Sequence, residues 1–142
     1  MSKNTLETKI RVKSSEWYIY FITPYLYHGP ELTLFCPQAL YLQNNKIKQL
    51  SDSIGNLKHL QTLNISGNNL KELPTRLSGL ENLKSLDVSN NSKLVKLPKE
   101  LGNLRTLETL NLDTDVVTYP SKDITKEGTE AIMRFFCSGK QE

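Results

Sequence analysis

Few side chains in this sequence form a pattern that catalysis would use. The two thiols, Cys36 and Cys137, lie far apart, and neither has a histidine beside it as a base, since the histidines are His28 and His59. The sequence contains no Cys-x-x-Cys pair to hold zinc and no glycine-rich loop to hold a phosphate. We therefore predict no catalytic residue, no metal site and no cofactor. The remaining polar residues point to recognition.

These polar residues recur at a fixed period together with leucines. Three segments of the form L-x-[LIV]-x-x-N follow one another at a spacing of 23 residues, and a fourth has aspartate in place of asparagine. The four are Leu40-x-Leu42-x-x-Asn45, Leu63-x-Ile65-x-x-Asn68, Leu86-x-Val88-x-x-Asn91 and Leu110-x-Leu112-x-x-Asp115. This signature is typical of leucine-rich repeats, in which each coil of a solenoid contributes one short parallel strand. We expect an α/β fold, a short horseshoe with a concave parallel sheet.

The other apolar residues of each repeat fit the inside of such a coil. Inward positions follow the strands at Ile47, Leu50, Ile54, Leu57 and Leu60, at Leu70, Leu73, Leu77, Leu80 and Leu83, at Leu94, Leu97, Leu101, Leu104 and Leu107, and at Val117. The third repeat has one additional residue, Ser92 or Lys93, which we expect to form a tolerated bulge. One coil alone buries too little apolar surface to offset its backbone entropy, so the coils must stack to fold.

The asparagines of the repeat predict a structural ladder. Asn45, Asn68 and Asn91 stand where the chain leaves each strand, and an amide side chain offers donors and acceptors to its own turn and to the neighbouring coil. Asp115 replaces asparagine in the last coil and, when ionised, can only accept hydrogen bonds. We expect this substitution to suit a coil that has no further coil beyond it.

Side chains that point outward from stacked strands should form columns on the concave face. The first column is Ala39, Thr62, Ser85 and Thr109; the second is Tyr41, Asn64, Asp87 and Asn111; the third is Gln43, Ser66, Ser89 and Asp113. Tyr41 is the single large anchor, and acidic groups gather at Asp87 and Asp113. Aromatic anchors and complementary charge often dominate protein interfaces, so the second and third columns predict a binding face for a basic or polar protein segment. The alternative is that these are merely solvated strand positions.

Composition and charge bound the remaining choices. The chain has 142 residues, 37% of them hydrophobic, which fits one soluble domain. The net charge of +3 is too small to argue for nucleic acid or an anionic membrane as the partner. Neither end has a local cluster of cysteines, so we expect a reducing cytoplasm and a monomer that binds a protein.

The repeat divides the chain into four segments. We expect a flexible leader over residues 1–15, an irregular N-terminal cap over 16–36, leucine-rich repeats over 37–120, and a helical C-terminal cap with its tail over 121–142. In the cap, Trp17–Ile22 alternates like a strand that lies beside the first repeat strand. The run is too short to span a membrane, and no cleavage site follows it.

The last segment has the pattern of an amphipathic helix. Ala131, Ile132, Phe135 and Phe136 fall on one side of it, while Glu130 and Arg134 form an i, i+4 pair on another. Gly128 and Thr129 supply the break before it and the expected N-cap. Because the helix follows the last repeat directly, we expect it to be a lid on the open end of the core.

Two resemblances follow from these motifs. The return limbs, with their L-P-x-x-[IL]-x-x-L form, resemble intracellular leucine-rich repeat proteins of the Ras-suppressor and Ras-scaffold kind. The closing segment resembles that of the leucine-rich repeat and sterile-alpha-motif E3 ubiquitin ligases. The residues that carry this resemblance are Leu112-Asp113, Val117, Tyr119-Pro120 and Glu127-Gly128-Thr129-x-Ala131-Ile132-x-x-Phe135. That family transfers ubiquitin through a C-terminal RING, which this sequence lacks. The resemblance therefore implies a recognition portion rather than an enzyme.

Two functions stay open at this point. The first is a cytoplasmic protein-interaction module, the recognition portion of a ubiquitin-ligase-like or signalling scaffold protein. The second is a regulatory short isoform or fragment that competes with a longer E3 ubiquitin ligase relative for the same partner.

Overall fold

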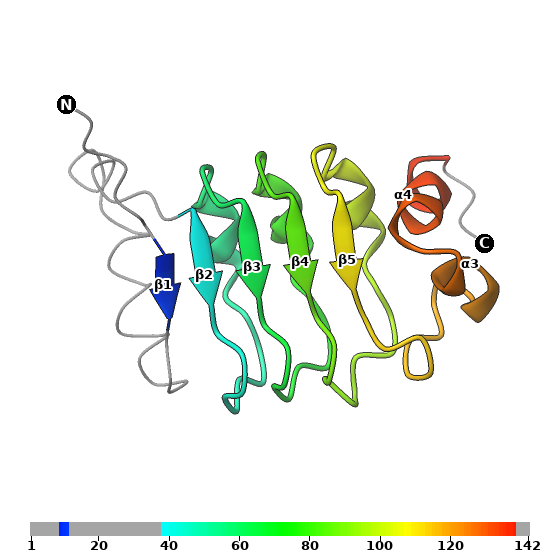
Figure 1. Ribbon diagram of the computed structural model, residues 1–142, viewed down its shortest axis with the longest axis horizontal. Helices are drawn as coiled ribbons and strands as arrows, with labels where there is room; N and C mark the ends of the chain where they lie inside the picture. The colour runs from blue at the N-terminus through cyan, green and yellow to red at the C-terminus, as the bar shows by residue number, and fades with distance from the viewer. Residues whose placement is uncertain (1–8, 12–37, 139–142) are drawn as a thin grey trace.

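The fold is a stack of coils built on one parallel sheet. The computed structural model describes residues 9–11 and 38–138. Its five strands lie side by side in chain order, and each repeat strand pairs in parallel with the next (Figure 1). The strands are β1 (Lys9–Arg11), β2 (Ala39–Tyr41), β3 (Thr62–Asn64), β4 (Ser85–Asp87) and β5 (Thr109–Asn111). The predicted solenoid with a parallel sheet is confirmed.

Short 3₁₀-helices carry the chain back from one strand to the next. They are η4 (Asp52–Asn56), η5 (Thr75–Gly79) and η6 (Lys99–Asn103), and they lie behind the sheet in Figure 1. Pro74 and Pro98 stand at the N-caps of η5 and η6, where the missing N–H of proline is no loss. Ser51 takes this place before η4, and its hydroxyl accepts a hydrogen bond from Ser53 N at 3.1 Å.

The core lies between the sheet and the 3₁₀-helices. It contains the inward leucines, isoleucines and valines of the repeats, and Leu40, Leu63 and Leu86 have no exposed surface. Three residues predicted as inward, Leu57, Leu107 and Leu112, are only half-buried and pack against the edge of the core. The additional residue of the third repeat lies in an exposed turn at Ser92 and Lys93, so Leu94 still reaches the core.

A column of glycines lets the return limbs approach closely. A Cβ atom on Gly55 would come within 2.2 Å of Arg76 O, and one on Gly79 within 2.7 Å of Gly55 O. The third glycine, Gly102, faces the C-terminal helix instead, where a Cβ would lie 2.9 Å from Phe136 Cβ. The helix therefore takes the place that a further coil would occupy.

The C-terminal lid consists of two helices, α3 (Lys122–Lys126) and α4 (Thr129–Cys137), which follow a cis Tyr119–Pro120 peptide bond. In Figure 1 they cover the end of the stack beyond β5. Ile132 and Phe136 are buried, and Cys137 Sγ donates to Gly102 O at 3.2 Å. The predicted helical cap is confirmed.

The N-cap of this lid differs from the prediction. Gly128, with a φ of 101°, holds the N-cap position, and Thr129 is the first helical residue. The Thr129 hydroxyl instead accepts a hydrogen bond from Leu110 N of β5 at 2.9 Å. Because β5 is the last strand, this side chain satisfies an amide that has no following strand to pair with.

The N-terminal region also differs from the prediction. Strand β1 pairs in parallel with β2, with Ile10 opposite Leu40, although residues 1–15 were expected to be a flexible leader. The expected cap over 16–36, including Trp17–Ile22, lies outside the described residues, as does the tail after residue 138. Within the described part of the chain, no helix is long and apolar enough to cross a membrane.

Candidate functional site

The sheet aligns the outward side chains into the columns expected from the repeat. Residues opposite one another are Tyr41, Asn64, Asp87 and Asn111 in one column, and Ala39, Thr62, Ser85 and Thr109 in the next. The same pairing continues past the strand ends, since Asn44 N donates to Ser66 O at 2.9 Å and Gly67 N donates to Ser89 O at 3.0 Å. We call the outward residues of these columns the concave face.

Exposure on the concave face increases from β2 toward β5. Ala39, predicted to point outward, is only 5% exposed. Tyr41, Asn64 and Asp87 are half-buried, whereas Asn111 is exposed. The outward residues of β5, Thr109 and Asn111, are therefore the most accessible part of the face.

Two of the outward residues also fix the backbone of their own coil. Asn64 Oδ1 accepts hydrogen bonds from Ser66 N at 3.0 Å and Ser66 Oγ at 2.8 Å. Asp87 Oδ1 accepts the same pair from Ser89, at 3.0 and 2.6 Å. Sequence reasoning missed these local turns, although the Asn/Asp-x-Ser pattern in adjacent repeats was a signal for them. One Asp87 oxygen is thus occupied.

Asp113 is held in a different way, across two coils. Its Oδ2 accepts a hydrogen bond from Asn90 N at 2.7 Å. The second oxygens of Asp87 and Asp113 accept no hydrogen bond from the described residues. With one strand spacing and two residues between them, the two carboxylates lie roughly 8 Å apart. The face therefore presents two fixed negative groups that can still accept from a partner.

Gln43 follows β2 in the third column of the concave face. It is half-buried, and its Oε1 is shielded from solvent without a hydrogen-bond partner among the described residues. The predicted contact residues remain Tyr41, Gln43, Asn64, Asp87, Asn111 and Asp113, with Ser66 and Ser89 supporting two of them.

The asparagine ladder has a structural role. Asn68 Nδ2 donates to Leu42 O, Ile65 O and Ser66 O, while its Oδ1 accepts from Ile47 N. Asn91 repeats this arrangement one coil later, with Leu70 N donating to its Oδ1 at 3.1 Å. Asn45 is half-buried and donates to Leu42 O and Gln43 O of its own turn. Each buried amide thus joins two coils.

A second asparagine position, just before the ladder, shapes the turn. Asn44, Gly67 and Asn90 have positive φ values of 60°, 66° and 55°, a conformation open mainly to glycine and asparagine. In the fourth coil this position is Thr114, which does not adopt a positive φ. The chain turns differently there, so Asp115 is exposed and takes no part in the ladder. This exposed position agrees with the expectation that Asp115 stands in a coil with no further coil beyond it.

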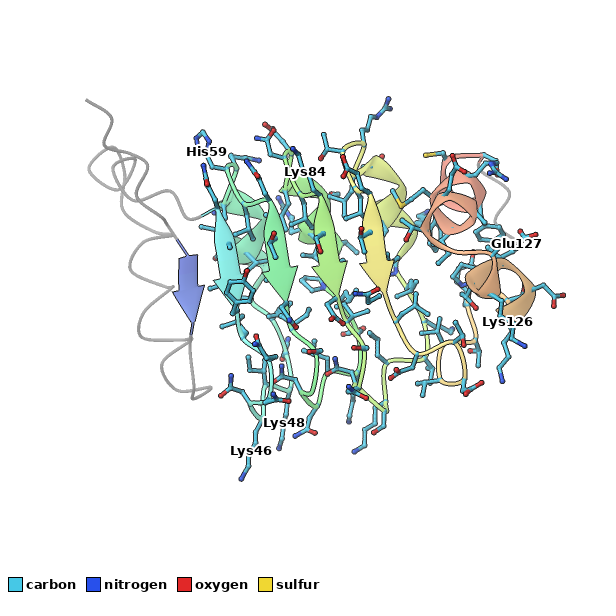
Figure 2. The ribbon with its side chains drawn as sticks, in the orientation of Figure 1. Lys46, Lys48, His59, Lys84, Lys126 and Glu127 are labelled. Atoms are coloured by element: carbon cyan, nitrogen blue, oxygen red, sulfur yellow. The ribbon has the colours of Figure 1, made fainter. Side chains whose placement is uncertain are left out.

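The thiols and histidines do not form a reactive site within the described residues. Cys137 and His59 are exposed, and His59 lies at the opposite end of the molecule from the lid that carries Cys137 (Figure 2). No group of three His, Cys, Asp or Glu side chains that could hold a metal ion comes together between residues 38 and 138. Cys36 and His28 lie outside the described residues.

Residues 33–129 match the family described as "Leucine-rich repeat region". The chain belongs to this leucine-rich repeat family. Among solved structures it is similar to a leucine-rich repeat protein of Leptospira interrogans, with 35% sequence identity and a TM-score of 0.52. That likeness covers 61% of this chain and 24% of the other, so this chain spans about a quarter of that protein's length. No curated protein matches this chain. Leucine-rich repeat domains generally act as protein-interaction modules rather than enzymes.

Proposed function

We propose that this leucine-rich repeat domain binds a basic or polar segment of a partner protein on its concave face. One observation carries the proposal: strands β3 to β5, paired in one register, place the half-buried Asp87 and Asp113 beside Asn64 and Asn111, and each of the two carboxylates keeps one oxygen that accepts no hydrogen bond from the described residues. Lysine or arginine side chains of an extended segment can reach the second oxygens of both carboxylates. Complementary charge of this kind gives specificity and faster association.

The half-buried Tyr41 completes the proposed contact at the N-terminal end of the face. An aromatic side chain can contribute a large contact area at low entropic cost, and tyrosines are enriched among binding hot spots. The partner segment would therefore run across the strands, with an apolar group near Tyr41 and its positive groups near Asp113. This orientation follows the increase in exposure toward β5.

We further propose that the domain is the recognition portion of a ubiquitin-ligase-like or signalling scaffold protein, acting as a cytoplasmic monomer. The support is the closing segment from Leu112 to Phe135, which resembles that of the ligase family, together with the free thiol of Cys137. Recognition alone transfers nothing, so the chain incubated with E1, E2, ubiquitin and ATP should form no ubiquitin conjugates. Products that depend on the E2 would contradict this assignment.

The concave face is tested by removing its charge without changing its shape. The double variant Asp87→Asn/Asp113→Asn should keep the two hydrogen bonds that residue 87 accepts from Ser89, because the amide oxygen of Asn64 already accepts the equivalent two bonds from Ser66. Basic peptides selected from a random displayed library against the wild-type chain should bind this variant about tenfold more weakly. That loss equals about 1.4 kcal/mol, within reach of two partly exposed ion pairs.

The matched control for this experiment removes two charges from the lid. Asp123 and Glu127 are exposed on and beside α3, and Glu127 lies well away from the sheet in Figure 2. Asp123→Asn/Glu127→Gln should therefore leave the affinity for the same peptides unchanged. Equal binding by the wild-type chain and the concave variant, or equal losses in both variants, would overturn the concave assignment.

A further inference from the structure

A second surface feature lies away from the concave face, where the chain passes from the strands into the 3₁₀-helices. A groove of about 350 Å³ there is lined by residues from the last three coils, among them Leu73, Leu97 and Tyr119. The coils are tied together at this point, because Leu97 N donates to Tyr119 O at 2.9 Å. Its volume is at the small end of the range for ligand pockets, which is about 300 to 1,000 Å³.

The floor of the groove is apolar and held in place. Leu73 and Leu97 are buried at the base, and Pro98 and Tyr119 are half-buried beside them. The Tyr119 ring packs against Phe135 and Phe136 of the lid, with ring centroids 5.8 and 6.1 Å apart. This wall is therefore preformed, so an apolar side chain could enter without rearrangement of the coil.

The border of the groove is basic. Lys96 and Lys99 line it and are exposed, and neither belongs to an ion pair in the described part of the chain. Four further exposed lysines stand on the same edge of the coils, beyond the C-terminal ends of the strands, where Figure 2 shows the first two. They are Lys46, Lys48, Lys71 and Lys93. Glu72 is the one acidic residue that lines the groove.

We propose that this groove binds an acidic segment of a partner protein. One apolar side chain of that segment enters between Leu73, Pro98 and Tyr119, and flanking Asp or Glu carboxylates meet Lys96 and Lys99. Charge complementarity selects an acidic partner, and the recessed apolar floor selects a polypeptide. A contact made by phosphates alone, as with a lipid headgroup or a nucleic acid backbone, would use Lys96 and Lys99 and leave the apolar floor unused.

The site is tested with the same displayed library of random twelve-residue peptides, selected against the full chain. One variant, Lys96→Glu/Lys99→Glu, reverses the border charge. A second, Thr75→Trp, fills the groove from an exposed lining position at the start of η5 and changes no charge. The matched control, Lys84→Glu/Arg105→Glu, makes the same change in net charge on exposed residues; Lys84 lies at the other edge of the sheet in Figure 2.

The wild-type chain should enrich peptides in which one apolar residue is flanked by Asp or Glu. A synthetic peptide of this kind should bind at least tenfold more weakly to each groove variant, while the control and Asp87→Asn/Asp113→Asn should bind it as the wild type does. The measurement on Asp87→Asn/Asp113→Asn separates the groove from the concave face, because the result for one site does not depend on the result for the other.

Three results would overturn the inference. The first is a selection that enriches no acidic peptide with an apolar residue. The second is wild-type affinity for such a peptide in either groove variant whose thermal unfolding is unchanged. The third is binding of phosphatidylserine vesicles or a single-stranded oligonucleotide that depends on Lys96 and Lys99 while no peptide binds, which would assign the lysines to a lipid or nucleic acid surface.

Discussion

Asparagine has three different structural roles in this chain, each set by its place in the coil. Asn68 and Asn91 join neighbouring coils through buried amides. Asn44 and Asn90 adopt the left-handed turn before the ladder position, and Asn64 closes a local turn with Ser66. Because these positions have different backbone conformations, an asparagine moved to the neighbouring position would not perform the same structural role.

The ladder role predicts a large loss of stability on truncation. Asn91→Ala should lower the free energy of unfolding by about 2 to 4 kcal/mol, because Leu70 N and the carbonyls of Ile65 and Val88 lose buried hydrogen-bond partners. Urea unfolding followed by circular dichroism measures this change. Asn69→Ala, at an exposed position in the preceding coil, is the control and should shift stability by less than about 0.5 kcal/mol.

At the residue scale, the sequence predicted the ladder and the alignment of the columns, because both depend on spacing alone. It did not predict that Asn64 and Asp87 would be bound by Ser66 and Ser89, since spacing does not show which polar atoms meet. The exposed position of Asp115 also depends on the backbone conformation of the preceding turn, which residue spacing does not show. The turn before it needs a positive φ, which the β-branched Thr114 does not adopt.

At the scale of elements, the lid completes the stack by replacing a missing coil at three points. Phe136 packs over Gly102, where a further return limb would otherwise approach. Thr129 accepts from Leu110 N of the last strand, and Cys137 donates to Gly102 O of the last 3₁₀-helix. The lid thus satisfies both the strand side and the helix side of the final coil.

Removal of the lid should therefore affect the whole stack. Ile132 and Phe136 are buried, and together they contribute about 3 to 6 kcal/mol, against a total stability of about 5 to 15 kcal/mol for a domain. A chain that ends at Pro120 should lose its cooperative thermal transition or melt at least about 10 °C lower in differential scanning calorimetry. Since each coil is held only by its neighbours, the loss should not stay at one end.

The control for this truncation is a change on the outer side of α4. Arg134→Ala breaks an exposed pair with Glu130, whose nitrogen and oxygen lie 3.7 Å apart, and should shift the melting temperature by no more than a few degrees. If the truncated chain melted as cooperatively and as high as Arg134→Ala, the lid would be an appendage rather than part of the stack.

The predictability of the elements differs for clear reasons. The apolar positions of α4 recur at helical spacing, so its existence and its covering role followed from the sequence. Strand β1 did not, because three residues, Lys9 to Arg11, carry no period, and their partner strand stands 30 residues away in the sequence. Thr129 was misassigned because its hydroxyl, which would suit an N-cap, instead accepts a hydrogen bond from Leu110 N of the last strand, β5.

At the scale of the whole molecule, opposite charges lie on separate surfaces. Asp87 and Asp113 stand on the concave face, whereas Lys96 and Lys99 border the groove at the edge of the coils. The small net charge of +3 hides this separation, since it sums over both surfaces. A partner with a basic and an acidic segment could engage both surfaces at once, and linkage of the two contacts would raise its overall affinity.

The central claim is that the concave face of the sheet is the surface that recognises a basic segment. The most direct test is a titration of the ¹⁵N-labelled chain with a selected basic peptide, followed by amide chemical shifts. We predict that the shifted amides cluster in residues 62–66, 85–89 and 109–113, and that the shifts are lost in Asp87→Asn/Asp113→Asn. Shifts confined to the 3₁₀-helices η4 to η6 or to the lid, or shifts that persist unchanged in that variant, would contradict the claim.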